Sequence, residues 1–182
     1  MTVAYMRGFQ GESLSDQSVM TMVKHFPGGG PQLDGLDPHL KSGESQVYPG
    51  DHFDYPLAPF FAAIEHDMRV VMPYYGIPTG QTDEDVAMAY NRQILTDLLR
   101  DQLGFEGVIC TDWGVVTGRI WGVEPLTVEE RYLKSIEAGV DQYGGESDPE
   151  YIVNLVDQGA ISEARIDAVS YTHLRAHETL LD

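Results

Sequence analysis

The chain has 182 residues, of which 42% are hydrophobic and 22% charged, an ordinary globular composition that supports one moderate core. A complete eight-stranded (β/α)8 barrel typically takes about 250 residues, so the chain is short for one. Its 29 acidic and 11 basic residues give a formal net charge of -18, which argues against nucleic acid and anionic membranes as partners.

The spacing of apolar residues predicts strands and helices that alternate along most of the chain. Residues 1–9 look like the end of an element that begins earlier, and Gly8 to Gly11 is expected to break any helix there. In chain order, the further expected elements are a strand over 17–25, a Gly- and Pro-rich loop over 26–56, a helix over 57–67, a strand over 69–75, a helix from Thr82 or Asp83 to Leu103, a strand over 108–112, a helix over 127–138, a strand over 140–143, a helix over 148–159 and a helix from 162 toward 169.

Short connections between strands and helices predict right-handed βαβ units and therefore a parallel α/β sheet. Four such units amount to half of an eight-fold barrel, or to most of a small doubly wound sheet. In both architectures ligands gather at the carboxyl ends of the strands. Here those ends carry Lys24-His25, Met72 to Tyr75, Asp112-Trp113 and Tyr143. Their convergence predicts a catalytic cleft on one side of the sheet.

Residues 170–182 depart from this pattern. They resemble the translation of sequencing-adaptor or vector DNA appended to an interrupted reading frame, so we expect them to be non-native and exclude them from the fold. Their two histidines have no partner cluster, and His39 and His52 in the long loop match no known metal-ligand spacing. We therefore expect no metal. Cys110, the single cysteine, lies in an apolar strand, where a buried inert thiol is expected.

The strand over 108–112 ends in a carboxylate, Asp112, that is followed directly by an indole, Trp113. Such a pair suits a site in which a sugar ring stacks on the aromatic residue and is attacked by the acid. A strand-ending Asp that caps the next helix explains this window equally well.

Two further motifs are open to a catalytic or a structural interpretation. Lys24-His25 precedes Gly28 to Gly30, but the order of a phosphate-binding loop is absent, so sugar hydroxyls are better ligands than phosphate. The same pair also fits a structural Lys and a core His. In Asp37-Pro38-His39, an Asp that orients a His makes a general acid/base, whereas a turn with an exposed His explains the motif as well. Met72 and Tyr75 fit either a pocket wall or the core.

Several motifs in order closely resemble the family 3 glycoside hydrolases, the β-glucosidase group, over residues 1 to about 169. They are Gly8-Phe9-Gln10-Gly11, Lys24-His25-Phe26, Val71-Met72-Pro73-Tyr74-Tyr75, Gly104 to Gly114, and Ala138-Gly139-Val140-Asp141. The resemblance implies that residues 1–169 form the C-terminal half of a (β/α)8 barrel of the TIM type. It further implies partners in the remaining barrel strands and a following domain, a secreted or periplasmic parent, and no cofactor.

The resemblance also implies the roles of individual residues. Asp112 is expected to be the nucleophile of a retaining, exo-acting enzyme that releases terminal β-D-glucosyl residues through a covalent glycosyl-enzyme. Trp113 is expected to line the sugar subsite. Lys24 and His25 are expected to bind sugar hydroxyls, and Met72 and Tyr75 to wall the pocket. In most of the family the acid/base is a Glu in a domain after the barrel, which this chain does not reach.

Three alternatives stay open at this point. The β-N-acetylglucosaminidase branch uses an Asp-x-His dyad as acid/base, and Asp37-Pro38-His39 resembles it, although Gly28 to Gly30 replaces that branch's Gly-His-Gly. A non-catalytic sugar-binding remnant would keep Trp113 without a complete acid/base pair. A nucleotide-binding doubly wound domain is disfavoured by the loop chemistry. Because half a barrel leaves two sheet edges unpaired, we expect poor solubility and aggregation when the chain is expressed alone.

Overall fold

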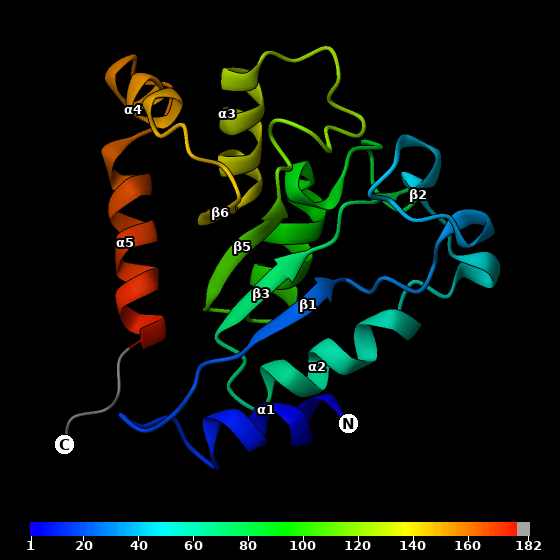
Figure 1. Cartoon of the computed structure of the whole chain (residues 1–182), viewed down its shortest axis with the longest axis vertical. Coiled ribbons are helices and arrows are strands. Elements are labelled where there is room, and N and C mark those ends of the chain that lie inside the picture. The colour runs from blue at the N-terminus through cyan, green and yellow to red at the C-terminus, as the bar shows by residue number, and fades with distance from the viewer. Residues whose placement is uncertain (178–182) are drawn as a thin grey trace.

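In the computed structural model, which describes residues 1–177, four parallel strands form the centre of the molecule (Figure 1). They are β1 (Met22–Phe26), β3 (Val70–Pro73), β5 (Val108–Trp113) and β6 (Gln142–Gly144), and they pair in that order. A doubly wound sheet reverses its strand order at a switch point, whereas a barrel adds each new strand on the same side. The four strands show no such reversal, which agrees with a partial barrel.

Each strand is followed by helical structure, so the four expected βα units are present. The helices are α1 (Thr2–Gln10), α2 (Ala58–Ile64), the π-helix η6 (Gln93–Gln102), α3 (Val128–Ala138), α4 (Glu150–Asp157) and α5 (Glu163–His177). A second parallel pair, β2 (Ser45–Gln46) with β4 (Ile77–Pro78), and the short turns η1 (Leu33–Gly35), η2 (Lys41–Gly43), η3 (Pro49–Asp51), η4 (Tyr55–Leu57) and η5 (Met88–Tyr90) lie in the connections.

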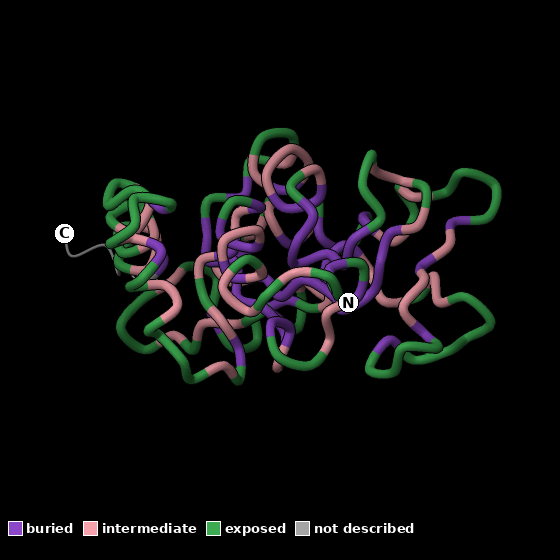
Figure 2. The backbone as a smooth tube through the Cα atoms, turned by 90° about the horizontal axis from the view of Figure 1, so that it is seen from above, coloured by how far each residue is buried: buried purple, intermediate pink, exposed green. Residues whose placement is uncertain are grey.

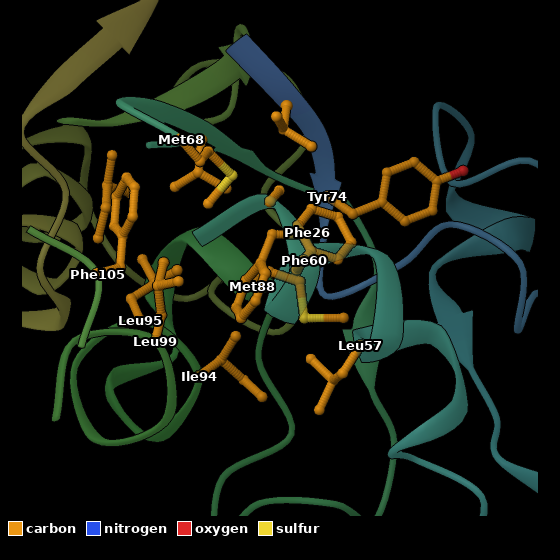
Figure 3. Packing of buried hydrophobic residues seen from close by; sticks show 14 of the residues in the cluster. Phe26, Leu57, Phe60, Met68, Tyr74, Met88, Ile94, Leu95, Leu99 and Phe105 are labelled. Carbon is orange, nitrogen blue, oxygen red and sulfur yellow. The ribbon is translucent and has the colours of Figure 1, made fainter. Parts of the chain in front are cut away.

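The largest core lies between one face of the sheet and helices α1, α2 and η6. Figure 3 shows part of it, including Phe60 of α2 and Leu95 of η6. Val71 and Ile109 face it from adjacent strands, and the ring of Phe26 meets that of Phe60 edge-on at 5.1 Å. Burying an apolar side chain of this size stabilises the fold by about 1.5–3 kcal/mol. Burial is concentrated along the strands, whereas much of the connecting backbone is exposed (Figure 2).

The opposite face of the sheet carries the alternate residues of the strands. Val108 and Cys110 point to it from β5, and Ala176 of α5 packs on them. Cys110 is buried, and burial raises the pKa of its thiol to about 11, so the thiol is unreactive as expected. Asp112 lies two residues further along β5. By the alternation of side chains it belongs to the same face, near the carboxyl end of the strand.

Several boundaries differ from expectation. Helix α1 continues through Gly8 to Gln10 and ends at Gly11, whose φ of 83° suits a glycine. A glycine inside a helix weakens it by only about 1 kcal/mol, which does not break it. The strand expected from residue 17 starts at Met22. Helix α5 starts after Ser162, whose hydroxyl accepts the Arg165 N–H, but it extends beyond 169 to His177.

The helix expected to begin at Thr82 or Asp83 begins instead at Gln93. The side chain of Asn91 accepts the Ile94 N–H and so closes the first turn, while its amide donates to Thr82 at 2.8 Å. The residues expected to cap the helix are thus held in an irregular segment in front of it. The buried Tyr90 packs from that segment and not from the helix.

By contrast, the helix expected over 127–138 is present with its capping box. The Thr127 hydroxyl accepts the Glu130 N–H, and the Glu130 carboxylate accepts the Thr127 N–H at 2.7 Å. The proposed non-native origin of residues 170–182 stays a prediction, and its last part, 178–182, lies outside the described residues. Within residues 1–177 no helix is long and apolar enough to cross a membrane.

Candidate active site

Strands β1, β3 and β5 end side by side and bring most of the predicted site residues to one edge of the sheet. The register of the parallel strands places these ends next to one another, because Lys24 lies opposite Met72 and Val71 opposite Ile109. In the described part of the chain, no group of three or more His, Cys, Asp or Glu side chains is placed to hold a metal ion.

Asp112 is the centre of this edge, and its carboxylate is held by three donors. Its Oδ1 accepts the Trp113 N–H at 2.7 Å and the Tyr75 hydroxyl at 2.9 Å, and its Oδ2 lies 3.2 Å from His25 Nε2. Burial raises the pKa of Asp112, but these hydrogen bonds outweigh it and lower the pKa to about 2. Asp112 is therefore ionised at ordinary pH. It does not cap a helix, since α3 begins at Val128 with Thr127 as its cap.

Tyr75 is buried beneath this carboxylate. Its hydroxyl has two acceptors within reach, Asp112 Oδ1 and the Trp113 carbonyl oxygen at 2.8 Å, and one proton to donate. Burial, followed by the hydrogen bond to Asp112, raises the pKa of Tyr75 to about 12, so the hydroxyl stays a neutral donor. Its ring also contacts His39, at 4.7 Å between ring centroids, and the Arg119 guanidinium, which lies 5.5 Å from the ring centroid. Tyr75 is thus a donor to Asp112 as well as a wall.

Trp113 is the exposed member of the pair, with 60% of its surface accessible. Gly144 and Gly145 back the indole so closely that a Cβ at either position would collide with it. The two glycines let the ring lie flat against the tip of β6. The result is an open aromatic platform beside an ionised carboxylate, as a sugar-stacking site requires.

The remaining predicted residues differ in their placement. Met72 is buried with 4% of its surface accessible. Lys24 is exposed and forms no ion pair with any carboxylate of residues 1–177. Of the Lys24-His25 pair, only His25 therefore contacts Asp112. Both Lys24 and His25 line a groove of about 850 Å³ that continues along Gly28 to Pro31.

The Asp37–His39 pair is formed. Asp37 Oδ1 lies 2.6 Å from His39 Nδ1 and accepts the His39 backbone N–H at 2.9 Å. These hydrogen bonds, the backbone one first, lower the pKa of the Asp37 carboxyl. Because Nδ1 is used by Asp37, Nε2 remains for proton transfer. Through the contact of His39 with Tyr75, the pair lies one aromatic ring away from Asp112.

Sequence reasoning missed Arg119 and Trp121, which lie in the loop between β5 and α3. Arg119 forms the cation–π contact with Tyr75, and the indole N–H of Trp121 donates to the Pro38 carbonyl oxygen at 2.8 Å. A tryptophan inside a loop was the available signal, since a large aromatic residue outside the strands and helices still needs a packing partner.

Residues 1–175 match the model of the glycosyl hydrolase family 3 N terminal domain. The chain belongs to glycosyl hydrolase family 3. Among curated relatives, probable beta-glucosidase C of Aspergillus flavus is 49% identical over 177 residues, which covers 92% of this chain and 28% of that protein. Beta-glucosidase C of Emericella nidulans is 46% identical over 192 residues, covering 100% of this chain and 31% of that protein.

Two further proteins extend the comparison. The periplasmic beta-glucosidase/beta-xylosidase of Dickeya chrysanthemi is 36% identical, over 92% of this chain and 30% of its own length. The structure of a family 3 beta-N-acetylglucosaminidase from Paenibacillus sp. str. FPU-7 is similar at a TM-score of 0.78 and 27% identity, covering 96% of this chain and 32% of that one. The family 3 chain thus spans less than a third of these relatives. The predicted family and partial barrel are confirmed.

Proposed function

We propose that this chain forms the nucleophile half of a retaining, exo-acting glycoside hydrolase that acts on terminal β-D-glucosyl residues. The observation that carries the proposal is the ionised carboxylate of Asp112, fixed by three donors beside the exposed indole of Trp113. The names of the relatives support a β-glucosidase. The periplasmic relative supports an exported parent protein. We propose that the activity needs partners, namely further barrel strands and a following domain, since the chain covers only 28–31% of these curated relatives.

The geometry supports different roles for the two oxygen atoms of the Asp112 carboxylate. Oδ1 is anchored by the Trp113 N–H and the Tyr75 hydroxyl, whereas Oδ2 meets only His25. We therefore assign Oδ2 as the atom that bonds to the anomeric carbon while the bond to the aglycone oxygen breaks and that oxygen takes a proton from an acid. Water then displaces Asp112 from the anomeric carbon and gives a proton to the deprotonated acid, which now acts as the base. Lys24 is free to donate to sugar hydroxyls.

For the acid/base we propose the Asp37–His39 dyad, and two observations support it. The pair is formed, and His39 contacts the same Tyr75 that donates to the nucleophile. His39 Nε2 would protonate the aglycone oxygen and later accept the proton of water, while Asp37 stabilises the charged imidazole. The competing assignment is a Glu of a domain beyond this chain. The dyad also keeps a β-N-acetylglucosaminidase as the second candidate function.

Covalent labelling tests the proposal. We define the grafted enzyme as beta-glucosidase C of Emericella nidulans in which residues 1–169 of this chain replace the matching segment. Incubation with 2,4-dinitrophenyl 2-deoxy-2-fluoro-β-D-glucoside should release one dinitrophenolate and add one fluoroglucosyl group to the peptide that carries Asp112, as read by mass spectrometry. Asp112→Asn is the control and should stay unlabelled. Labelling of another residue would refute the nucleophile, and exclusive turnover of N-acetylglucosaminides would favour the second function.

Tyr75→Phe tests the electrostatics of the site. The phenol helps to lower the pKa of Asp112 to about 2, so its removal should raise that pKa. Because attack needs the ionised carboxylate, the acid limb of the kcat/KM profile should move to higher pH. The alkaline limb should not move, which provides the internal control. An unchanged acid limb would show that Tyr75 does not act on the nucleophile.

A further inference from the structure

The dyad lies on a segment that has little structure of its own. Residues 36–40 connect the turns η1 and η2, and the side chains of Asp37 and His39 are 64% and 51% exposed. Their mutual hydrogen bonds fix the pair internally but do not fix it relative to Asp112. A proton donor has to be held within hydrogen-bond distance of the aglycone oxygen, so something else must position this segment.

Trp121 makes that connection. Its indole N–H donates to the carbonyl oxygen of Pro38, the residue between the two members of the dyad, and this 2.8 Å hydrogen bond is buried. The Trp121 side chain is itself fixed, with only 8% of the residue exposed. Lys41, just after the dyad, lies over the indole at 5.4 Å and pairs with Glu124 of the Trp121 loop. The two segments are 83 residues apart in sequence and meet directly.

The Trp121 loop, which joins β5 to α3, is held in place by contacts with residues 85–87. The Trp121 carbonyl oxygen accepts the Ala87 N–H at 3.0 Å. The next residue, Gly122, has a φ of 79° and lies so close to Asp85 and Val86 that a Cβ would come within 2.5 Å of the Asp85 carbonyl oxygen. The close approach leaves the loop little freedom to move.

This same loop begins at the nucleophile, because it joins the end of β5 to α3. We infer that Trp121 is a positioning residue that fixes the Asp37–His39 dyad to the loop of the nucleophile and so sets the distance for proton transfer. The inference rests on the proposed role of the dyad as acid/base. Gly43 supports the arrangement, since a Cβ there would collide with the Asp37 backbone.

Trp121→Phe in the grafted enzyme tests the inference, because it keeps an aromatic ring and removes the indole N–H donor together with part of the indole volume. The readout is the dependence of kcat/KM on the leaving group, because kcat/KM reports formation of the glycosyl-enzyme and not its hydrolysis. Phenyl β-glucoside needs a proton on its leaving oxygen, whereas 2,4-dinitrophenyl β-glucoside does not. For Trp121→Phe we expect kcat/KM to fall about tenfold on the phenyl glucoside, with little change in kcat/KM on the dinitrophenyl glucoside. A merely structural role would lower both rates together.

Tyr90→Phe is the matched control. The Tyr90 hydroxyl donates a buried 2.8 Å hydrogen bond to the Val115 carbonyl oxygen of the same loop but has no contact with the dyad segment. Its loss should leave the ratio of the two rates unchanged. Gly43→Ala, which displaces the dyad from its other side, should reproduce the selective loss and serves if Trp121→Phe does not fold.

The outcomes separate the inference from the proposed function. If Trp121→Phe and Gly43→Ala lower both rates equally or neither, while His39→Ala is selective for the phenyl glucoside, Trp121 does not position the dyad. If His39→Ala is itself not selective, the acid/base assignment fails, and the positioning role fails with it.

Discussion

Asp112→Ala is expected to lower kcat of the grafted enzyme by about 10⁴-fold or more, and sodium azide is expected to restore turnover with α-glucosyl azide as the product. Without the carboxylate no glycosyl-enzyme forms, and the small side chain leaves space on that face of the sugar. Azide then attacks the anomeric carbon directly, so one inversion replaces the two of the normal reaction. The anomeric configuration of the azide, read by NMR, identifies the role of Asp112.

The substitution should leave the fold intact. Tyr75 loses an acceptor in Asp112 but has the Trp113 carbonyl oxygen at 2.8 Å. The Trp113 N–H and His25 lose their acceptor, which costs about 1–3 kcal/mol for each donor that remains buried. A circular dichroism spectrum like that of the parent and a modest fall in Tm are therefore expected. Folded protein with near-parental activity, or a β-azide product, would refute Asp112 as nucleophile.

The parallel sheet was predictable because each strand is a short apolar run that ends in polar or aromatic residues. Val108 to Cys110 illustrates this, since Ile109 faces the helices and its neighbours face the other side. The helix start at Gln93 was not predictable from local signals. Thr82 is a good cap in isolation, but the tertiary contact with Asn91 uses its hydroxyl, and Asn91 closes the first turn instead.

The candidate site was predictable wherever a residue follows a strand directly. Asp112 and Trp113 are placed by β5 alone, and parallel pairing brings His25 beside them. Lys24 and His25 were both expected to bind sugar hydroxyls, but His25 also contacts the Asp112 carboxylate, which the sequence did not indicate. The location of the dyad depends on a hydrogen bond from Trp121, which no local pattern contains.

His39→Ala decides where the acid/base lies, and its effect should depend on the leaving group. Loss of a general acid lowers the rate by about 10²–10⁴-fold when the leaving oxygen needs a proton. We expect such a fall in kcat/KM on phenyl β-glucoside, with a much smaller fall in kcat/KM on 2,4-dinitrophenyl β-glucoside. Because the glycosyl-enzyme still forms with the activated substrate, azide should intercept it and yield β-glucosyl azide. The opposite anomer from Asp112→Ala would thus separate the two roles.

Asp37→Asn is the companion variant, since it keeps the shape of the dyad and removes the charge that stabilises a protonated His39. It should show the same leaving-group selectivity at smaller magnitude. His52→Ala is the matched control, because His52 lies in the same long connection without a carboxylate within ion-pair distance among residues 1–177, and it should leave the ratio of the two rates unchanged. A ratio of the two rates that His39→Ala leaves unchanged would show that His39 is not the acid/base. Such a result would favour a carboxyl of the following domain, with Asp112 still acting as the nucleophile.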